Sequence, residues 1–263
     1  MKSAWAIAAA VIGGAALAAA ATPRVAQPEA RPEPAIAAED LRAGGDEHKR
    51  YFLIGPREGA AEPADGWKVL LILPGGDGSA EFHPFVKNIA AKALPDGYLV
   101  AQLVAPVWRE DKNRIVWPTK GLPDDAMKFS TEEFIAAVVE DAAAKKKIDR
   151  RHVYALGWSS GGPPVYAASV TEGTPLTGAF VVMSVYKPEL MPPLVGAKGK
   201  AYYLLHSPDD FIKMRFPEAA KKELTEAGAA VELQTYEGGH GWKGDVFGNI
   251  RRGVEWLEGQ RAK

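Results

Sequence analysis

The sequence contains no cysteine in its 263 residues. Disulfide bonds, zinc–thiolate sites and thiol nucleophiles are therefore excluded. The protein is compatible with an oxidising compartment but cannot form disulfide bonds there. An excess of charge is also lacking, since 32 Lys and Arg residues stand against 33 Asp and Glu residues. Without a strong field of either sign, we expect no nucleic-acid partner and no attraction to an anionic lipid surface.

Long apolar runs are scarce as well, and the longest occupies residues 4–21. Lys2 precedes this run, which is rich in Ala and Gly and ends in small residues that offer several Ala-x-Ala cleavage points. The pattern is that of a secretory signal peptide, whereas a transmembrane anchor would be more hydrophobic and followed by basic residues. We therefore expect residues 1–21 to be a signal peptide, the protein to be periplasmic or secreted, and no stable membrane insertion after signal removal.

Residues 22–46 are rich in Pro, Ala and Glu and lack the apolar periodicity of a packed segment. Such a composition predicts a flexible spacer. Residues 47–263 show neither an internal repeat nor a second change of composition. We interpret them as one catalytic domain.

Short apolar runs alternate with helical patterns along this domain. The predicted strands are residues 48–54, 67–74, 98–106, 152–158, 177–185, 201–207 and 231–237. The predicted helices are residues 81–94, 131–147, 161–170, 217–228 and 247–260. Continuous apolar strands alternating with helices predict an α/β fold, in which a mostly parallel central sheet has helices on both faces.

A Gly-x-Ser-x-Gly pentapeptide, residues 157–161, directly follows one predicted strand and precedes a predicted helix. This is the setting of a nucleophile elbow, a tight turn that needs small flanking residues and raises the serine hydroxyl above the sheet. The alternative is a glycine-rich turn without chemistry. The strand–turn–helix setting favours Ser159 as a nucleophile, with the N–H of Ser160 directed at a developing oxyanion.

A serine hydroxyl needs a base within hydrogen-bonding reach, and a carboxylate to orient that base. His240 is the best base among five histidines, because it lies between glycines directly after the last predicted strand. The acid is expected after strand 201–207, where Asp209 and Asp210 both qualify on spacing. Loops at the carboxyl ends of parallel strands meet at one edge of the sheet, so these side chains are expected to converge.

The turn after the first buried strand reads Pro74-Gly75-Gly76-Asp77-Gly78. Its spacing fits neither the Walker nor the Rossmann phosphate-binding pattern. In a hydrolase this turn supplies the second oxyanion N–H, here from Gly76 or, one residue later, from Asp77.

Three tryptophans, Trp117, Trp158 and Trp242, are candidates for the walls of a substrate pocket. Trp158 and Trp242 flank the candidate catalytic residues, and Trp117 lies in the long loop of residues 107–129. Aromatic walls suit an aryl or acyl group, although core packing explains such residues equally well.

On these motifs the chain resembles the α/β-hydrolase superfamily, in particular its small carboxylesterase, dienelactone hydrolase and polyhydroxyalkanoate depolymerase-like branches, over about residues 48–258. The resemblance implies Ser159 as nucleophile and His240 as base. Placing the family's His-Gly-x-x-Asp motif on residues 206–210 implies Asp210 as the acid and a structural His206. The chain departs from the family at Pro74, where many members have histidine, and at Ser207, where glycine is usual.

The predicted activity is hydrolysis of a small-molecule carboxylic ester by a Ser–His–Asp triad through an acyl-enzyme, with no metal and no cofactor. Two alternatives remain open at this point. One is a serine peptidase of the same fold, and the other is a non-catalytic binding protein on a hydrolase scaffold.

Overall fold

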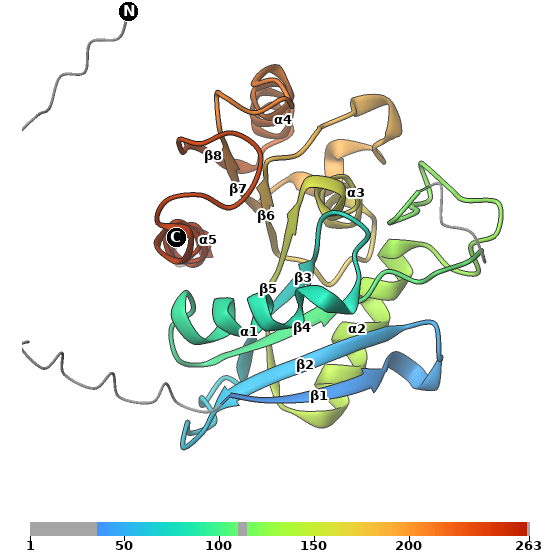
Figure 1. Ribbon diagram of the computed structural model, residues 1–263, viewed down its shortest axis with the longest axis vertical. Coiled ribbons are helices and arrows are strands. Elements are labelled where there is room, and N and C mark those ends of the chain that lie inside the picture. The colour runs from blue at the N-terminus through green and yellow to red at the C-terminus, as the bar shows by residue number, and fades with distance from the viewer. Residues whose placement is uncertain (1–35, 110–114, 262–263) are drawn as a thin grey trace, which may run out of the picture. The chain divides into compact units, whose positions relative to one another are not determined.

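One eight-stranded sheet organises residues 36–109 and 115–261, the parts of the chain that this computed structural model describes (Figure 1). Its spatial order is β1-β2-β4-β3-β5-β6-β7-β8. Strand β2 runs antiparallel to both β1 and β4, and every other neighbouring pair is parallel. The strands are β1 (Ile36–Arg42), β2 (Arg50–Arg57), β3 (Trp67–Leu73), β4 (Tyr98–Leu103), β5 (Ile148–Trp158), β6 (Gly178–Val182), β7 (Ala201–His206) and β8 (Ala230–Thr235).

Apolar side chains on both faces explain why the central strands are buried along their length. In β3, Leu70 and Ile72 belong to the core on one face, whereas Val69, Leu71 and Leu73 belong to the core on the other. Successive side chains of a strand point to opposite faces, so a continuous apolar run requires cover on both sides. The sequence prediction of buried parallel strands is confirmed.

Five α-helices among the described residues supply that cover (Figure 1). Helices α1 (His83–Lys92) and α5 (Val246–Arg261) pack on one face, where Val86, Ile89 and Ile250 share a cluster with the sheet. The opposite face carries α2 (Thr131–Lys145), α3 (Gly162–Val170) and α4 (Arg215–Glu226). The expected α/β architecture, with helices on both faces, is confirmed.

Residues 36–46 differ from the expectation. Their composition predicts a flexible spacer, but they form β1 and a short 3₁₀ turn (Ala43–Gly45). Most of β1 is exposed, and it is held by main-chain pairing with β2 and by Asp40, which pairs with Arg42 and Arg50. Because the strand buries little apolar surface, its sequence lacks the periodicity that marks a strand. The predicted signal peptide and the remainder of the spacer lie outside the described residues.

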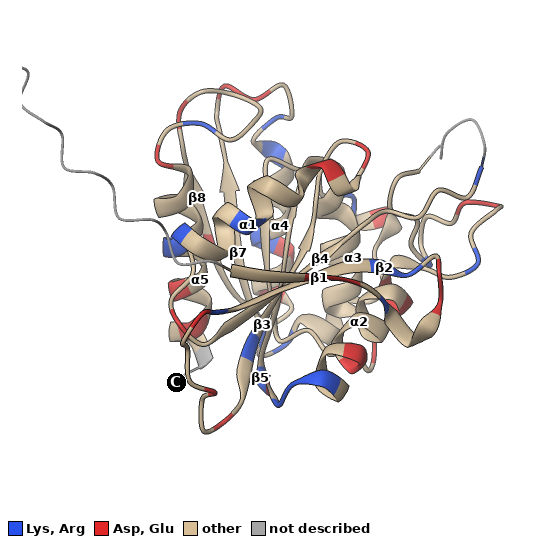
Figure 2. Cartoon of the chain, turned by 60° about the horizontal axis from the view of Figure 1, so that its bottom comes forward, with Lys and Arg blue, Asp and Glu red and all other residues tan. Residues whose placement is uncertain are grey.

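Charged residues of both signs are interspersed over loops, helices and strands in the view of Figure 2. The charged residues also make mixed-sign pairs, such as Arg150 with Glu140 and Arg151 with Asp65. Within the described ranges, no helix combines the length and the apolar character needed to cross a bilayer.

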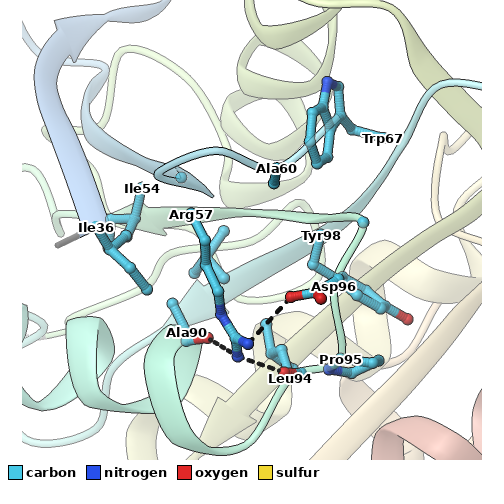
Figure 3. A pocket seen from close by; sticks show the side chains of 13 residues that line it. Ile36, Ile54, Arg57, Ala60, Trp67, Ala90, Leu94, Pro95, Asp96 and Tyr98 are labelled. Atoms are coloured by element: carbon cyan, nitrogen blue, oxygen red, sulfur yellow. Dashed lines mark hydrogen bonds and ion pairs between the residues drawn. The ribbon is translucent and has the colours of Figure 1, made fainter. Parts of the chain in front are cut away.

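Arg57, the last residue of β2, ties the antiparallel edge of the sheet to the end of α1 (Figure 3). Its guanidinium donates to the carbonyl oxygens of Ala90, Ala91 and Leu94 at 3.2, 2.8 and 2.7 Å, and to the Asp96 carboxylate at 3.0 Å. The last carbonyls of a helix have no donor within the helix itself. Arg57 therefore supplies hydrogen-bond donors to carbonyl oxygens at the carboxyl end of α1 that the helix itself leaves unpaired.

Replacing Arg57 by Met should lower the free energy of unfolding by about 1–3 kcal/mol, because charge-assisted hydrogen bonds to the helix end are lost. Arg150→Met is the matched control, since the Arg150–Glu140 pair is 55% and 63% exposed and such pairs contribute about 1 kcal/mol or less. Urea unfolding of both variants measures the difference. Equal, small losses would contradict the assigned role of Arg57.

Candidate active site

Ser159 lies in a sharp turn between β5 and α3. Its φ is +51°, a left-handed conformation that side-chain-bearing residues adopt at a cost. The backbone on both sides is crowded, because a Cβ at Gly157 would overlap the Gly161 carbonyl, and one at Gly161 would overlap the Leu73 carbonyl. Only glycine fits at these two positions. The turn has the strand–turn–helix geometry that the pentapeptide predicts.

The side chains of Ser159, His240 and Asp210 are brought together by the ends of β5, β8 and β7. Ser159 Oγ lies 3.1 Å from His240 Nε2. His240 Nδ1 lies 3.0 and 2.9 Å from the two carboxylate oxygens of Asp210. The Asp210 side chain is fully buried, whereas that of His240 is 24% exposed. An imidazole held in this way has one nitrogen fixed by a carboxylate and the other directed at a hydroxyl.

The two adjacent acids that spacing could not separate have different surroundings. Asp210 is buried, and its Oδ1 also accepts a hydrogen bond from the N–H of Ile212 at 2.8 Å. Asp209 is exposed. His206 is buried and bonds through Nε2 to the Ile212 carbonyl at 2.7 Å. Of the two carboxylates, that of Asp210 therefore faces His240, and the His206 ring is hydrogen-bonded to the turn that carries Asp210. The role of Asp210 as the catalytic acid stays a prediction.

The loop of His240 is held by side chains that sequence reasoning missed. Tyr236 Oη lies 2.9 Å from the Gly239 carbonyl and 3.0 Å from the Gly241 carbonyl, so its one proton is shared between the peptides flanking His240. The N–H of Gly241 donates to Met183 Sδ at 3.1 Å. Burial, followed by the nearby charge of Asp210, raises the pKa of Tyr236 to about 12. The phenol therefore remains a donor at any pH well below that value.

Ser207 supplies a further contact to this loop. Its Oγ accepts hydrogen bonds from the N–H of Gly239 at 3.0 Å and from the N–H of Asp209 at 3.2 Å. The Ser207 hydroxyl links the turn that carries Asp210 to the loop that carries His240. The glycine that is usual in the family at this position could not make these hydrogen bonds.

The sequence gives one signal that the loop of His240 has a special geometry, namely the glycines on both sides of this residue.

The turn after β3 packs directly on the serine turn. A Cβ at Gly75 would lie 2.8 Å from the main-chain carbonyl oxygen of Trp158, so the two backbones approach closely. The Ser160 hydroxyl donates to the Gly76 carbonyl at 2.9 Å, which links the two residues predicted to supply oxyanion donors. Binding of an oxyanion by their N–H groups, or by that of Asp77, stays a prediction.

Two of the three candidate pocket tryptophans are core residues. Trp117 and Trp158 are 3% and 4% exposed. Trp117 Nε1 donates to the Pro74 carbonyl at 3.0 Å and thereby supports the turn after β3. The Trp158 ring packs edge-on against Phe82, Phe85 and Trp242.

Packing explains both buried rings, which leaves little of their surface for a substrate. Trp242 is only partly buried, and its Nε1 finds no hydrogen-bond partner among the residues described. Contact of any of the three with substrate stays a prediction.

Comparison of the sequence finds no matching family model and no curated relative. Solved structures do match. A carboxylesterase from Mesorhizobium loti is 18% identical, with a TM-score of 0.61 over 84% of this chain and 99% of that one. A truncated carbohydrate esterase from gut microbiota is 14% identical, with a TM-score of 0.65 over 89% and 99% of the two chains.

A third similar structure is MGS-M1, an α/β-hydrolase enzyme from a Medee basin deep-sea metagenome library. It is 14% identical, with a TM-score of 0.61 over 88% of this chain and all of that one. At such identities the likeness extends to the fold and not to the activity. Together with the strand order and the turn after β5, it shows that this chain has the α/β-hydrolase fold.

Proposed function

We propose that this protein is a serine hydrolase that cleaves carboxylic esters through an acyl-enzyme. Ser159 is the nucleophile, His240 the general base and acid, and Asp210 the residue that orients His240. The observation that carries the proposal is the continuous hydrogen-bonded chain from Ser159 Oγ through the imidazole to the buried carboxylate. The carboxylesterases among the structurally similar proteins support the same reaction class.

In the first half-reaction, His240 Nε2 takes the proton from Ser159 as Oγ attacks the ester carbonyl. Asp210 accepts a hydrogen bond from Nδ1–H, which fixes the tautomer with its lone pair on Nε2 and stabilises the imidazolium as it forms. His240 then donates the proton to the leaving alcohol. In the second half-reaction His240 takes a proton from water, whose oxygen attacks the acyl carbonyl. The bond between the acyl carbon and Ser159 Oγ then breaks, the carboxylic acid leaves, and His240 returns the proton to Oγ.

The N–H groups of Ser160 and Gly76 hold the oxyanion in this mechanism. The hydrogen bond from Ser160 Oγ to the Gly76 carbonyl keeps the two backbone segments in register before substrate arrives. Preorganised donors of this kind contribute about 3–4 kcal/mol each to stabilising the transition state. Apart from the ester and the attacking water, every group named in this mechanism belongs to a side chain or to the backbone of this chain.

We also propose that the protein is exported. The proposal rests on the weakly apolar run of residues 4–21 after Lys2, with its Ala-x-Ala sites. The absence of cysteine is compatible with an oxidising destination. N-terminal sequencing of protein recovered from the periplasm or medium tests this assignment.

Ser159→Ala should lower kcat for p-nitrophenyl acetate by at least about a thousandfold, because the acyl-enzyme can no longer form. Alanine adds no atoms to the turn, so the melting temperature should change little. Activity that survives the substitution would reject the site.

The same experiment separates the alternative activities. Comparable turnover of p-nitroacetanilide, a matched amide, would favour the peptidase alternative. Absence of all ester and amide hydrolysis in the wild type would favour the binding protein.

Asp210→Asn and Asp209→Asn form a matched pair of adjacent substitutions. The first should reduce kcat about 10³–10⁴-fold, since an amide does not stabilise the imidazolium and favours the wrong tautomer. The second should leave kcat near the wild-type value, because Asp209 faces solvent. Steady-state kinetics on one ester measures both. The opposite ranking would show that Asp209 is the acid.

Tyr236→Phe should lower kcat roughly fivefold with little change in KM, because a hydrogen bond worth about 1 kcal/mol no longer holds the loop of His240. Tyr51→Phe is the control: it removes the hydrogen bond from Tyr51 Oη to Asp141, 2.6 Å long, on another part of the fold. Unfolding measurements should show a similar loss of stability in both variants. Equal kcat values would contradict a positioning role for Tyr236.

A further inference from the structure

A large apolar side chain lies exposed beside the reacting groups. Phe211 is 70% exposed, and its ring centroid is 4.3 Å from that of the His240 imidazole, with the planes tilted by 39°. Exposed single hydrophobic residues are ordinary on protein surfaces. Phe211 is distinguished by its place, since one part of its ring contacts the proposed base and the remainder faces solvent.

The position of this ring is fixed by its neighbours in sequence. Phe211 lies between Asp210, whose carboxylate contacts His240, and Ile212, whose N–H donates to that same carboxylate at 2.8 Å. The carbonyl of Ile212 is bonded in turn to His206. The backbone on both sides of Phe211 is therefore held by hydrogen bonds. These bonds keep the phenyl ring of Phe211 beside the imidazole of His240.

The proposed chemistry defines which part of an ester passes this ring. The carbonyl oxygen must face the N–H donors of Ser160 and Gly76. The alcohol oxygen must come within hydrogen-bonding distance of His240 Nε2 to receive its proton. The first carbon atoms of the alcohol group then lie beside the imidazole, whose ring centroid is 4.3 Å from that of Phe211.

We propose that Phe211 is a specificity-determining residue that binds the alcohol part of the ester and selects aromatic alcohols. An aryl group covers the exposed ring and removes apolar surface of both from water, whereas a methyl group covers little of it. Phe211 is assigned to the alcohol side alone, so it does not select acyl length. This inference rests on the proposed ester hydrolysis.

The test compares esters that differ in only one half. Phe211→Ala should lower kcat/KM about 5–10-fold for 2-naphthyl acetate, in line with the value of an aromatic contact. Methyl acetate should change less than about twofold, because it makes little of that contact. The ratio of kcat/KM between p-nitrophenyl butyrate and p-nitrophenyl acetate should stay at its wild-type value. Because kcat/KM depends only on the steps up to acylation, a slow second half-reaction does not hide these differences.

Two further variants control the comparison. Phe211→Tyr retains an aromatic ring and should keep the wild-type preference for the naphthyl ester. Val195→Ala removes another exposed hydrophobic residue, 79% exposed, from the 3₁₀ turn Leu194–Ala197. It should leave all of the rates unchanged.

An equal loss on every ester would overturn the proposal, because the ring would then act through His240 and not on the alcohol. A change confined to the acyl series would overturn it as well. Failure of the proposed function has a different signature. In that case the wild type would not hydrolyse these esters, or Ser159→Ala would retain the activity, before any Phe211 variant is compared.

Discussion

The contact between His240 Nδ1 and the buried carboxylate of Asp210 is the interaction on which the proposed site depends. A carboxylate without exposure to water is unfavourable unless hydrogen bonds compensate for the lost hydration. Asp210 obtains them from the Ile212 N–H and from the imidazole. The contact therefore couples the stability of the turn after β7 to the direction of the imidazole, and Ser159 lies at the far side of that ring.

The sheet makes this contact possible by bringing distant segments to one edge. His240 is 81 residues from Ser159 and 30 residues from Asp210 along the chain. Each follows a strand of the parallel part of the sheet, and the glycine-rich loop after β8 gains its order from Tyr236, Ser207 and Met183. The sheet and these side-chain contacts therefore contribute differently. The sheet brings the three loops close together, and the contacts of Tyr236, Ser207 and Met183 fix the orientation of the imidazole.

Much of this could be predicted from sequence because burial on both faces leaves an apolar run, and β3, β4 and β7 each show one. Strand β1 escaped prediction, since main-chain pairing and ion pairs hold it without an apolar face. Spacing could not choose between Asp209 and Asp210, because adjacent residues follow the same strand and differ only in burial. The role of Tyr236 depends on the path of a loop that glycine leaves unconstrained, so no local pattern marks it.

Labelling with a fluorophosphonate, followed by mass spectrometry of the digested protein, tests the central claim most directly. Such a probe phosphonylates a serine whose hydroxyl is activated by a neighbouring base. Our account predicts one adduct, on the peptide that contains Ser159, and its loss when His240 is replaced by alanine. An adduct on another serine, or labelling of Ser159 that is unaffected by the loss of His240, would contradict it.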